Sequence, residues 1–249
     1  MENDELIKRI EDLARRCERN CCVTSTVFLT PAEQFAVSKW AACHPDAKLL
    51  MSGGHADCER KAVFFLPFYM EEEDLDLSEY ISAIALKTGF GEPGHRDYLG
   101  AALGLGIKRE WLGDIWVNGD CATVFCIPSV ESHLLLSLDK VGRWGVKSKK
   151  ISLSELNPPE KRTKSVSFSV KSARFDAVTA GMFRLSRNEA ASKIAAGDAS
   201  LNYSQCLRVD APVKEGDVIS LRGSGKGILG AEGGRSKKDR IFLTAEIFK

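Results

Sequence analysis

The first 76 residues carry helix-period and strand-period apolar patterns in turn. The predicted elements are helices at 2–19 and 30–43 and strands at 48–51 and 62–68. Apolar residues every three or four positions mark the first helix as amphipathic. Thr30 can cap the second helix, Pro31 suits its first position, and Glu33 completes a capping box. An acidic cluster at 71–76 closes the segment, so we predict an N-terminal α/β domain over residues 1–76.

Residues 77–157 follow a βαββαβ order. The expected elements are a strand at 81–87, a helix at 96–104, strands at 114–117 and 121–127, a helix at 130–141 and a strand at 146–152. Asn118-Gly119 between the two central strands is a strong hairpin signal. The order is the ferredoxin-like pattern that RNA-recognition (RRM) domains share with many proteins that bind no RNA. The short aromatic signature of RRM strands is absent, so the pattern predicts an RRM-like domain without fixing its ligand.

A third domain is predicted over residues 165–249. Pro158-Pro159 breaks any helix in the polar stretch before it, which marks a domain boundary. It opens with a helix at 176–183. Ser186 and Glu189 form a second capping box, and the helix after them stops at Gly197 before a strand at 199–202. This second helix is expected to bury Ala190, Ala191, Ile194 and Ala195. The chain is thus predicted to be an α+β protein of three small units, the last with two short helices packed on a small β-sheet.

Charge is distributed unevenly along the chain, although the formal net charge is only +1. Residues 161–249 contain 17 Lys and Arg against 9 Asp and Glu, whereas residues 1–160 contain 18 against 25. A basic end on an acidic body predicts binding to a polyanion, because neutralising phosphates releases counterions. No apolar run reaches the length of a membrane span, and the acidic start is unlike a secretory signal. We therefore expect a cytoplasmic protein with no membrane partner.

The eight cysteines form no Cys-x-x-Cys pair and are expected to be buried core residues. Cys17, Cys21 and Cys22 with Cys43-His44 offer zinc-ligating atoms, but their spacing fits no standard zinc motif. We expect neither a metal nor another cofactor.

Basic residues surround the start of the second C-terminal helix. A helix N-terminus offers free N–H groups and partial positive charge, which suit a phosphate. Arg184 and Arg187 flank this helix start, and Lys193 lies farther along. The opposite wall of a basic groove is expected from the strand at 199–202 with Arg208, Lys214 and Arg222.

Two segments resemble enzyme motifs but lack residues that those motifs require. The segment from Arg222 through Gly227 is not a P-loop, because Ser220 stands where that motif needs Gly and Gly227 stands where it needs Ser or Thr. We predict instead a mobile basic loop, extended by Arg235, Lys237, Lys238 and Arg240. His95-Arg96-Asp97 resembles the kinase catalytic triplet, but Ala102 stands where that motif needs Asn. A second phosphate-binding patch at His95, Arg96, Lys108 and Arg109 is one interpretation, and local capping with a solvated face is the other.

The pattern from Arg174 to Asn202 resembles the S4 RNA-binding module, and most of the chain resembles the YlmH-type S4-domain proteins of bacteria. The segments that carry this resemblance are Phe28–Gln34, Gly53-Gly54, Glu59–Lys61, His95–Gly100, Leu105–Arg109, Gly113–Ile115 and the S4 core. The resemblance implies RNA contacts at Arg174, Arg184, Ser186, Arg187, Lys193, Asn202 and Arg208. Tyr203 departs from the general S4 pattern, in which Gly often follows Asn, and an exposed Tyr there could stack on a base.

The resemblance also implies a function in ribosome quality control. The expected partners of a monomeric protein are structured RNA (rRNA and tRNA) and the large ribosomal subunit carrying stalled peptidyl-tRNA, with no small-molecule substrate. S4 modules also occur in RNA-modifying enzymes, for which Asp97 and Asp114 are the catalytic candidates in this chain. A cell-division-linked scaffold that binds a protein through its acidic body is a further alternative. We expect an RNA-binding protein that is not an enzyme.

Overall fold

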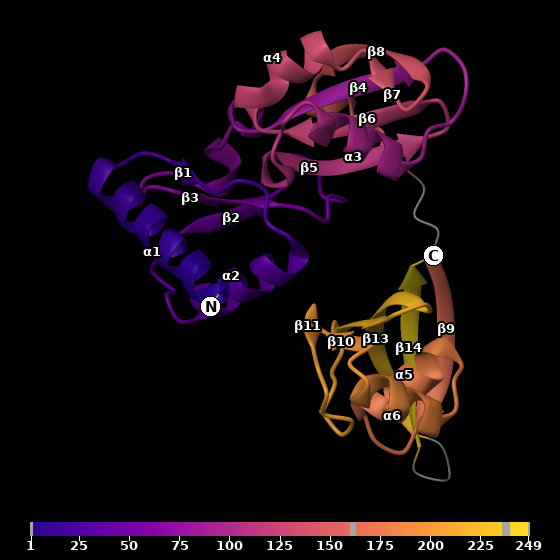
Figure 1. The fold of residues 1–249 in the computed structure, drawn as a ribbon. Helices are drawn as coiled ribbons and strands as arrows, with labels where there is room; N and C mark the ends of the chain where they lie inside the picture. Colours follow the sequence, from indigo (N-terminus) through magenta and orange to yellow (C-terminus); the bar gives the residue numbers. More distant parts are fainter. Residues whose placement is uncertain (1, 160–162, 236–239, 249) are drawn as a thin grey trace. The chain divides into compact units, whose positions relative to one another are not determined.

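The computed structural model describes residues 2–159, 163–235 and 240–248 (Figure 1). They fall into two compact units, Met1–Pro159 and Glu160–Lys249, divided directly after Pro158-Pro159. Both units mix helices with antiparallel sheets, as expected for an α+β protein. Within the described residues, none of the helices combines the length and the apolar composition that a membrane crossing requires.

The N-terminal part of the first unit packs two helices on a small sheet. Its elements are α1 (Glu2–Asn20), β1 (Thr24–Ser25), α2 (Pro31–Ala42), β2 (Leu49–Ser52) and β3 (Ala62–Phe65). The strands lie in the order β1-β3-β2, and the short β1 was not predicted. The capping box of α2 is confirmed: the Thr30 hydroxyl accepts from the Glu33 N–H, and the Glu33 carboxylate accepts from the Thr30 N–H. Apolar residues of both helices pack against Val63 and Phe65 of β3.

The rest of the first unit has the predicted βαββαβ order. Its elements are β4 (Ser82–Thr88), α3 (His95–Gly104), β5 (Leu112–Asn118), β6 (Cys121–Cys126), α4 (Pro128–Ser137), β7 (Lys140–Val141) and β8 (Trp144–Ile151). The antiparallel sheet has the order β5-β6-β4-β8-β7, which is the ferredoxin-like order with one extra edge strand. Helices α3 and α4 bury one face of it around Tyr98 and Leu134. The Asn118-Gly119 hairpin is confirmed, with Asn118 paired to Cys121.

Helix α4 is shorter than predicted. The sequence pattern extended it to Val141, but it ends at Ser137, and Lys140–Val141 form β7 instead. Val141 is fully buried by a tight hairpin to Trp144, with Gly142 at positive φ in the turn. Val141, whose spacing suggested one more turn of α4, is therefore buried as part of a strand.

The two parts of the first unit share a core. Phe28 and Phe64 from the N-terminal part pack in one cluster with Ala83, Trp116 and Phe125 from the face of the five-stranded sheet that α3 and α4 leave open. Those aromatic side chains are nearly inaccessible to solvent. Burial of this size fixes the N-terminal elements on one end of the sheet face.

The second unit places two short helices on a six-stranded antiparallel sheet. Its elements are β9 (Thr163–Val170), α5 (Phe175–Phe183), α6 (Arg187–Ala195), β10 (Ala199–Leu201), β11 (Ser204–Gln205), β12 (Val218–Leu221), β13 (Gly225–Arg235) and β14 (Ile241–Phe248). The strand order is β11-β10-β12-β13-β14-β9. Phe175, Val178 and Met182 of α5 are buried in the core of this unit. Gly181 lets α5 approach β9 closely, because a Cβ at that position would lie 2.2 Å from the Phe168 ring.

Two expectations for this unit are wrong. Residues 225–235 are not a mobile loop but strand β13, which pairs with β12 on one side and β14 on the other; Lys237 and Lys238 lie outside the described residues. The glycines of this segment suggested a loop. Gly227 instead serves close packing in the strand, because a side chain at that position would collide with Met182. On α6, Ala190 and Ile194 are buried as predicted, but Ala191 is half-buried and Ala195 is exposed.

The cysteines do not all lie in the core. Cys17, Cys58 and Cys126 are buried, and burial raises the pKa of Cys58 and Cys126 to about 12. Cys21, Cys22 and Cys43 are exposed, which contradicts the expectation for them. Among the described residues, no cluster of His, Cys, Asp and Glu has the geometry of a metal site.

Candidate nucleic-acid interface

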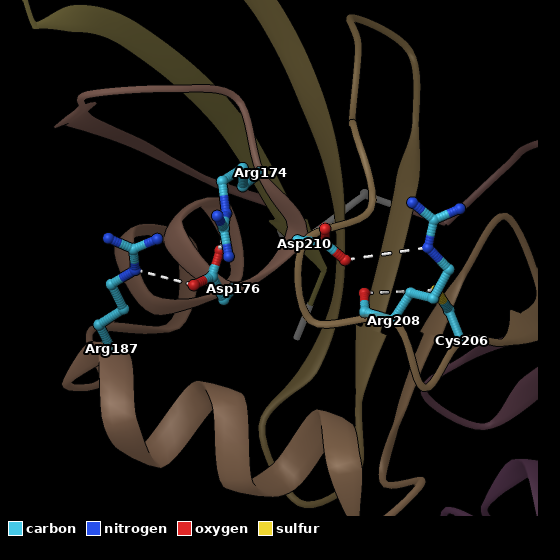
Figure 2. Close-up of polar contacts among 6 residues, drawn as sticks. All are labelled: Arg174, Asp176, Arg187, Cys206, Arg208 and Asp210. Carbon is cyan, nitrogen blue, oxygen red and sulfur yellow. Dashed lines mark hydrogen bonds and ion pairs between the residues drawn. The ribbon is translucent and has the colours of Figure 1, made fainter.

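A buried carboxylate holds two arginines at the start of α5. The Asp176 carboxylate accepts hydrogen bonds from Arg187 Nε at 2.8 Å and from Arg174 Nε at 3.2 Å, one on each oxygen. Figure 2 shows Asp176 lying between the two arginine side chains. Arg174 is the residue before α5 and Arg187 is the first residue of α6. The ion pairs therefore join the starts of the two helices.

Asp176 differs from its partners in exposure. Its side chain is 5% exposed, whereas those of Arg174 and Arg187 are 42% and 54% exposed. Burial by itself raises the pKa of Asp176, but the hydrogen bonds from Arg187 and Arg174 outweigh it and hold that pKa below its usual value. The carboxylate is thus charged at neutral pH and screens the repulsion between two neighbouring guanidinium groups.

Both arginines use only Nε for this carboxylate. Their Nη groups have no hydrogen-bond partner within the part of the chain that the structure describes, and more than a third of each side chain faces solvent. A guanidinium fixed through one nitrogen keeps its other N–H groups in a planar fork that fits phosphate oxygens. Two such forks around one anchor can bind an anionic backbone at a low cost in side-chain entropy.

Arg184 lies in the turn that joins the same two helices. It ends α5 in the left-handed conformation, with φ +56° and ψ +44°, and its side chain is exposed. The N–H groups of Arg184 and Leu185 both donate to Ala180 O, which fixes the turn. A positive φ is costly for an arginine. The turn places this cation three residues before Arg187.

The start of α6 is less free for a phosphate than the sequence suggested. Ser186 Oγ accepts from the Glu189 N–H, and the Glu189 carboxylate accepts from the Ser186 N–H at 2.8 Å, so the predicted capping box is confirmed. The Glu189 carboxylate thereby occupies the positive end of the helix. Ser186 is consequently a capping residue, and the guanidinium groups are the stronger anion-binding feature of this site.

Asn202 and Tyr203 form the tight turn between β10 and β11. Both have positive φ, +49° and +65°, and Leu201 pairs with Ser204 across the turn. The Asn202 amide donates to the buried Asp217 carboxylate and accepts from the Val218 N–H, each at 2.9 Å. Asn202 therefore has a structural role. Tyr203 is half-buried rather than exposed. It stands at a turn position that favours glycine, so its backbone is strained there.

The remaining cations of the predicted groove are dispersed. Arg208 pairs with Asp210 at 3.8 Å (Figure 2). Their segment lies next to α5, because Val209 O accepts a hydrogen bond from the Asp176 N–H. Arg222 lies beyond the C-terminal end of α6, with its guanidinium 3.9 Å from Asp198. Lys193 is half-buried in the last turn of α6, Lys214 is exposed in the turn before β12, and Lys226 lies over the Phe248 ring on β13. The structure thus joins Arg174 and Arg187 at Asp176, with Arg184 in the turn between the two helices, whereas the Arg208 guanidinium lies on the other side of Asp210 (Figure 2) and the remaining cations stand at separate places.

The second predicted patch is not a single cluster. His95 and Arg96 are exposed in the first turn of α3, whereas Lys108 and Arg109 follow its other end. A ten-residue helix is about 15 Å long, so it separates the two pairs. The Arg109 guanidinium donates to the carbonyls of Leu112 and Gly113, which gives Arg109 a structural role. His95, Arg96 and Lys108 remain candidates for RNA contact.

The two catalytic candidates also hold the fold together. Asp97 accepts from the Gly94 N–H at 2.8 Å, which caps α3 as the sequence suggested. Asp114 accepts from the N–H groups of Glu59 and Arg60, at 2.6 and 3.0 Å. Each carboxylate thus has a structural use that accounts for its presence.

Sequence reasoning missed the anchor of the site. Asp176 was expected only to begin a helix, although it stands two residues after Arg174 and in the first helical turn. An arginine two residues before an aspartate can fold its side chain back to the carboxylate. This spacing was the signal in the sequence that could have indicated the ion pair. The second partner, Arg187, is eleven positions away and meets Asp176 only through the packing of α5 on α6.

Comparisons with known proteins match most of the chain. A protein-family model described as "Putative RNA-binding domain in YlmH" matches residues 71–155, which include the whole five-stranded sheet. The "Ribosome-associated protein quality control protein P2" of Bacillus subtilis (strain 168) is 32% identical over 221 residues, covering 89% of this chain and 86% of that protein. A solved structure, "Cell division protein ylmH from Streptococcus pneumoniae", is similar with a TM-score of 0.47 and 23% identity, over 62% of this chain and 89% of that chain.

Proposed function

The chain belongs to the YlmH-type family, as its sequence motifs predicted, and on this premise we propose that it is an RNA-binding factor of the ribosome. The more specific proposal is that it binds the large ribosomal subunit carrying stalled peptidyl-tRNA, in ribosome quality control. Its partners are then structured rRNA and tRNA. It acts as a monomer in the cytoplasm, without catalysis or a cofactor.

The observation that carries this proposal is the pair of guanidinium groups held by Asp176. Arg174 and Arg187 share one buried carboxylate through Nε, and their side chains are 42% and 54% exposed, while Arg184 adds a further exposed cation in the adjoining turn. Fixed, planar donors are suited to the phosphates of a folded RNA, whose backbone presents anionic oxygens at a defined spacing. We assign the second unit as an S4 domain on this basis, with the helices α5 and α6 facing the RNA.

The domain arrangement follows from the same premise. We propose an N-terminal α/β domain over 1–76, an RRM-like domain over 77–157 and the S4 domain over 165–249. The family model that matches residues 71–155 supports RNA binding by the second of these. The acidic N-terminal domain repels bare polyanions, so we assign it to selectivity for the ribosome rather than to general RNA affinity.

The direct test is to identify the RNA that crosslinks to the full-length protein in cells. Large-subunit rRNA and tRNA should be enriched relative to a variant with Arg184→Gln and Arg187→Gln. Both arginines have exposed side chains, and the substitution Arg187→Gln retains an amide group that can donate to the Asp176 carboxylate. Equal recovery of the same RNAs with the variant would overturn the assignment of the site.

A further inference from the structure

The five-stranded sheet of the first unit has an uncovered strip that neither the helices nor the N-terminal part occupies. Side chains alternate along β4, β6 and β8, and α3 and α4 pack on the face that carries Ile84, Val124 and Val146. On the opposite face, Ala83 and Phe125 lie in the core shared with the N-terminal part. On β4 and β6, the next residues along this face, Ala85 and Thr123, are only half-buried.

Three lysines stand on this uncovered strip. Lys87 of β4 is paired directly with Lys147 of β8, and Ala85 with Lys149, so all three side chains project from the same face. Each of them is exposed. The parity is confirmed by their neighbours, because Ile151 on β8 and Ala83 on β4 share this face and contact the N-terminal core.

The strip between and beside the lysines carries small or polar side chains. Across β4 and β6, Ala85 pairs with Thr123 and Lys87 with Cys121. Trp116 ends the row on β5, but it is only 8% exposed and its ring lies edge-on to His55. The strip therefore offers a flat cationic surface without an aromatic platform on which bases would stack.

Few acids neutralise this strip. Asp120 Oδ2 lies 4.0 Å from Lys87 Nζ, whereas Lys147 and Lys149 have no ion-pair partner among the described residues. Lys150, which points to the other face, is paired with Glu131 of α4 at 2.9 Å. The segment from Asp139 to Ile151 contains five lysines and arginines and one acid, within a unit whose acids outnumber its bases. The positive charge is thus concentrated on and next to one sheet face.

We propose that the strip formed by Lys87, Lys147 and Lys149 is a second RNA-binding surface, which contacts the sugar–phosphate backbone without reading the bases. This inference rests on the proposed RNA-binding function and extends it to a defined face of the first unit. Lysines two residues apart on a strand are about 7 Å apart and give flexible point charges, which suit phosphates of varying position. Together with the S4 site, the strip raises affinity through effective concentration.

The test compares two double variants of the full-length protein. Lys147→Gln with Lys149→Gln removes two charges from the strip, and Arg16→Gln with Arg19→Gln removes two exposed charges from α1 as the matched control. The probe is a fluorescently labelled RNA hairpin with a single-stranded tail, and its affinity is measured by anisotropy over a series of salt concentrations. Loss of two phosphate contacts should lower the slope of log affinity against log salt by about 1.4–1.8, with weaker binding at low salt. The α1 control should keep the wild-type slope.

Further variants separate this inference from the proposed function. Lys147→Arg with Lys149→Arg keeps the charge and should keep the wild-type slope. The variant with Arg184→Gln and Arg187→Gln, in the same assay, reports on the S4 site alone. A wild-type slope for the Lys147 and Lys149 double Gln variant, or an equal loss in the α1 control, overturns the inference even when the S4 variant is impaired. If the strip binds an acidic protein instead of RNA, the Lys147 and Lys149 double Gln variant should keep the wild-type slope.

Discussion

Asp176 determines how the cationic side chains of the second unit are arranged. Arginines are flexible when they stand alone on a surface, and ordering them on a ligand costs conformational entropy. Here a carboxylate that is nearly inaccessible to solvent holds Arg174 and Arg187 in the absence of a ligand. Because the carboxylate is buried and paired, its loss affects both the stability of the unit and the direction of two cations.

The first prediction concerns Asp176→Asn. The pKa of Asp176 is below its usual value in the folded protein, so its charged form stabilises the fold above about pH 4 and this contribution disappears as the pH falls further. The variant should therefore lose about 1–3 kcal/mol at neutral pH. Thermal melts of wild type and variant across acidic pH provide the measurement. A stability difference that stays constant below pH 4 would argue against the ion pairs.

The second prediction concerns Tyr203, a bulky residue at positive φ. Tyr203→Gly should raise the melting temperature or leave it unchanged, because glycine adopts this turn conformation without strain. If the tyrosine stacks on a base, the same variant binds RNA more weakly. Tyr203→Phe keeps the ring and serves as the control. A marked loss of stability in Tyr203→Gly would show that the ring serves packing instead.

At the level of elements, the sequence predicted those whose signals are local. The capping boxes at Thr30 and Ser186 and the hairpin after Asn118 depend on a few adjacent residues, and all three are present. Strand β9 was missed because its pairing partner, β14, is distant in the sequence. The strand form of residues 225–235 was missed although its partners β12 and β14 are adjacent in the sequence, because its many glycines are unusual in a strand. At the carboxylate anchor of the site, distance in the sequence explains only the missed Arg187 partner, which is eleven positions from Asp176, because Arg174 is two residues away.

The third prediction tests the close packing of α5 on β9. Gly181→Ala places a methyl group against the Phe168 ring, so the helix must shift and the unit should lose about 1–3 kcal/mol. Gly100→Ala in α3 meets no atom within 4 Å and should gain up to about 1 kcal/mol from helix propensity. Chemical denaturation of both variants measures the contrast. Similar stabilities for the two would mean that α5 does not depend on this contact.

At the level of the whole molecule, the charges divide between a basic second unit and an acidic first unit. The structure adds that the first unit carries a lysine strip on one sheet face, so its charge is uneven within the unit as well. A protein with two cationic surfaces and an acidic remainder is suited to a large RNA assembly that can engage both surfaces. On a short RNA helix that reaches only one of the two surfaces, the second surface adds little affinity.

The most direct measurement is co-sedimentation of the full-length protein with large ribosomal subunits that carry peptidyl-tRNA. The wild type and the Arg16→Gln, Arg19→Gln control should both sediment with the subunits. The variant with Arg184→Gln and Arg187→Gln should remain in the supernatant at moderate salt, although it is still folded at the assay temperature in a thermal melt, because each fixed contact to phosphate contributes about 1.5–3 kcal/mol. Co-sedimentation of that variant at the wild-type level would contradict the assignment of the cations around Asp176 as the RNA-binding site.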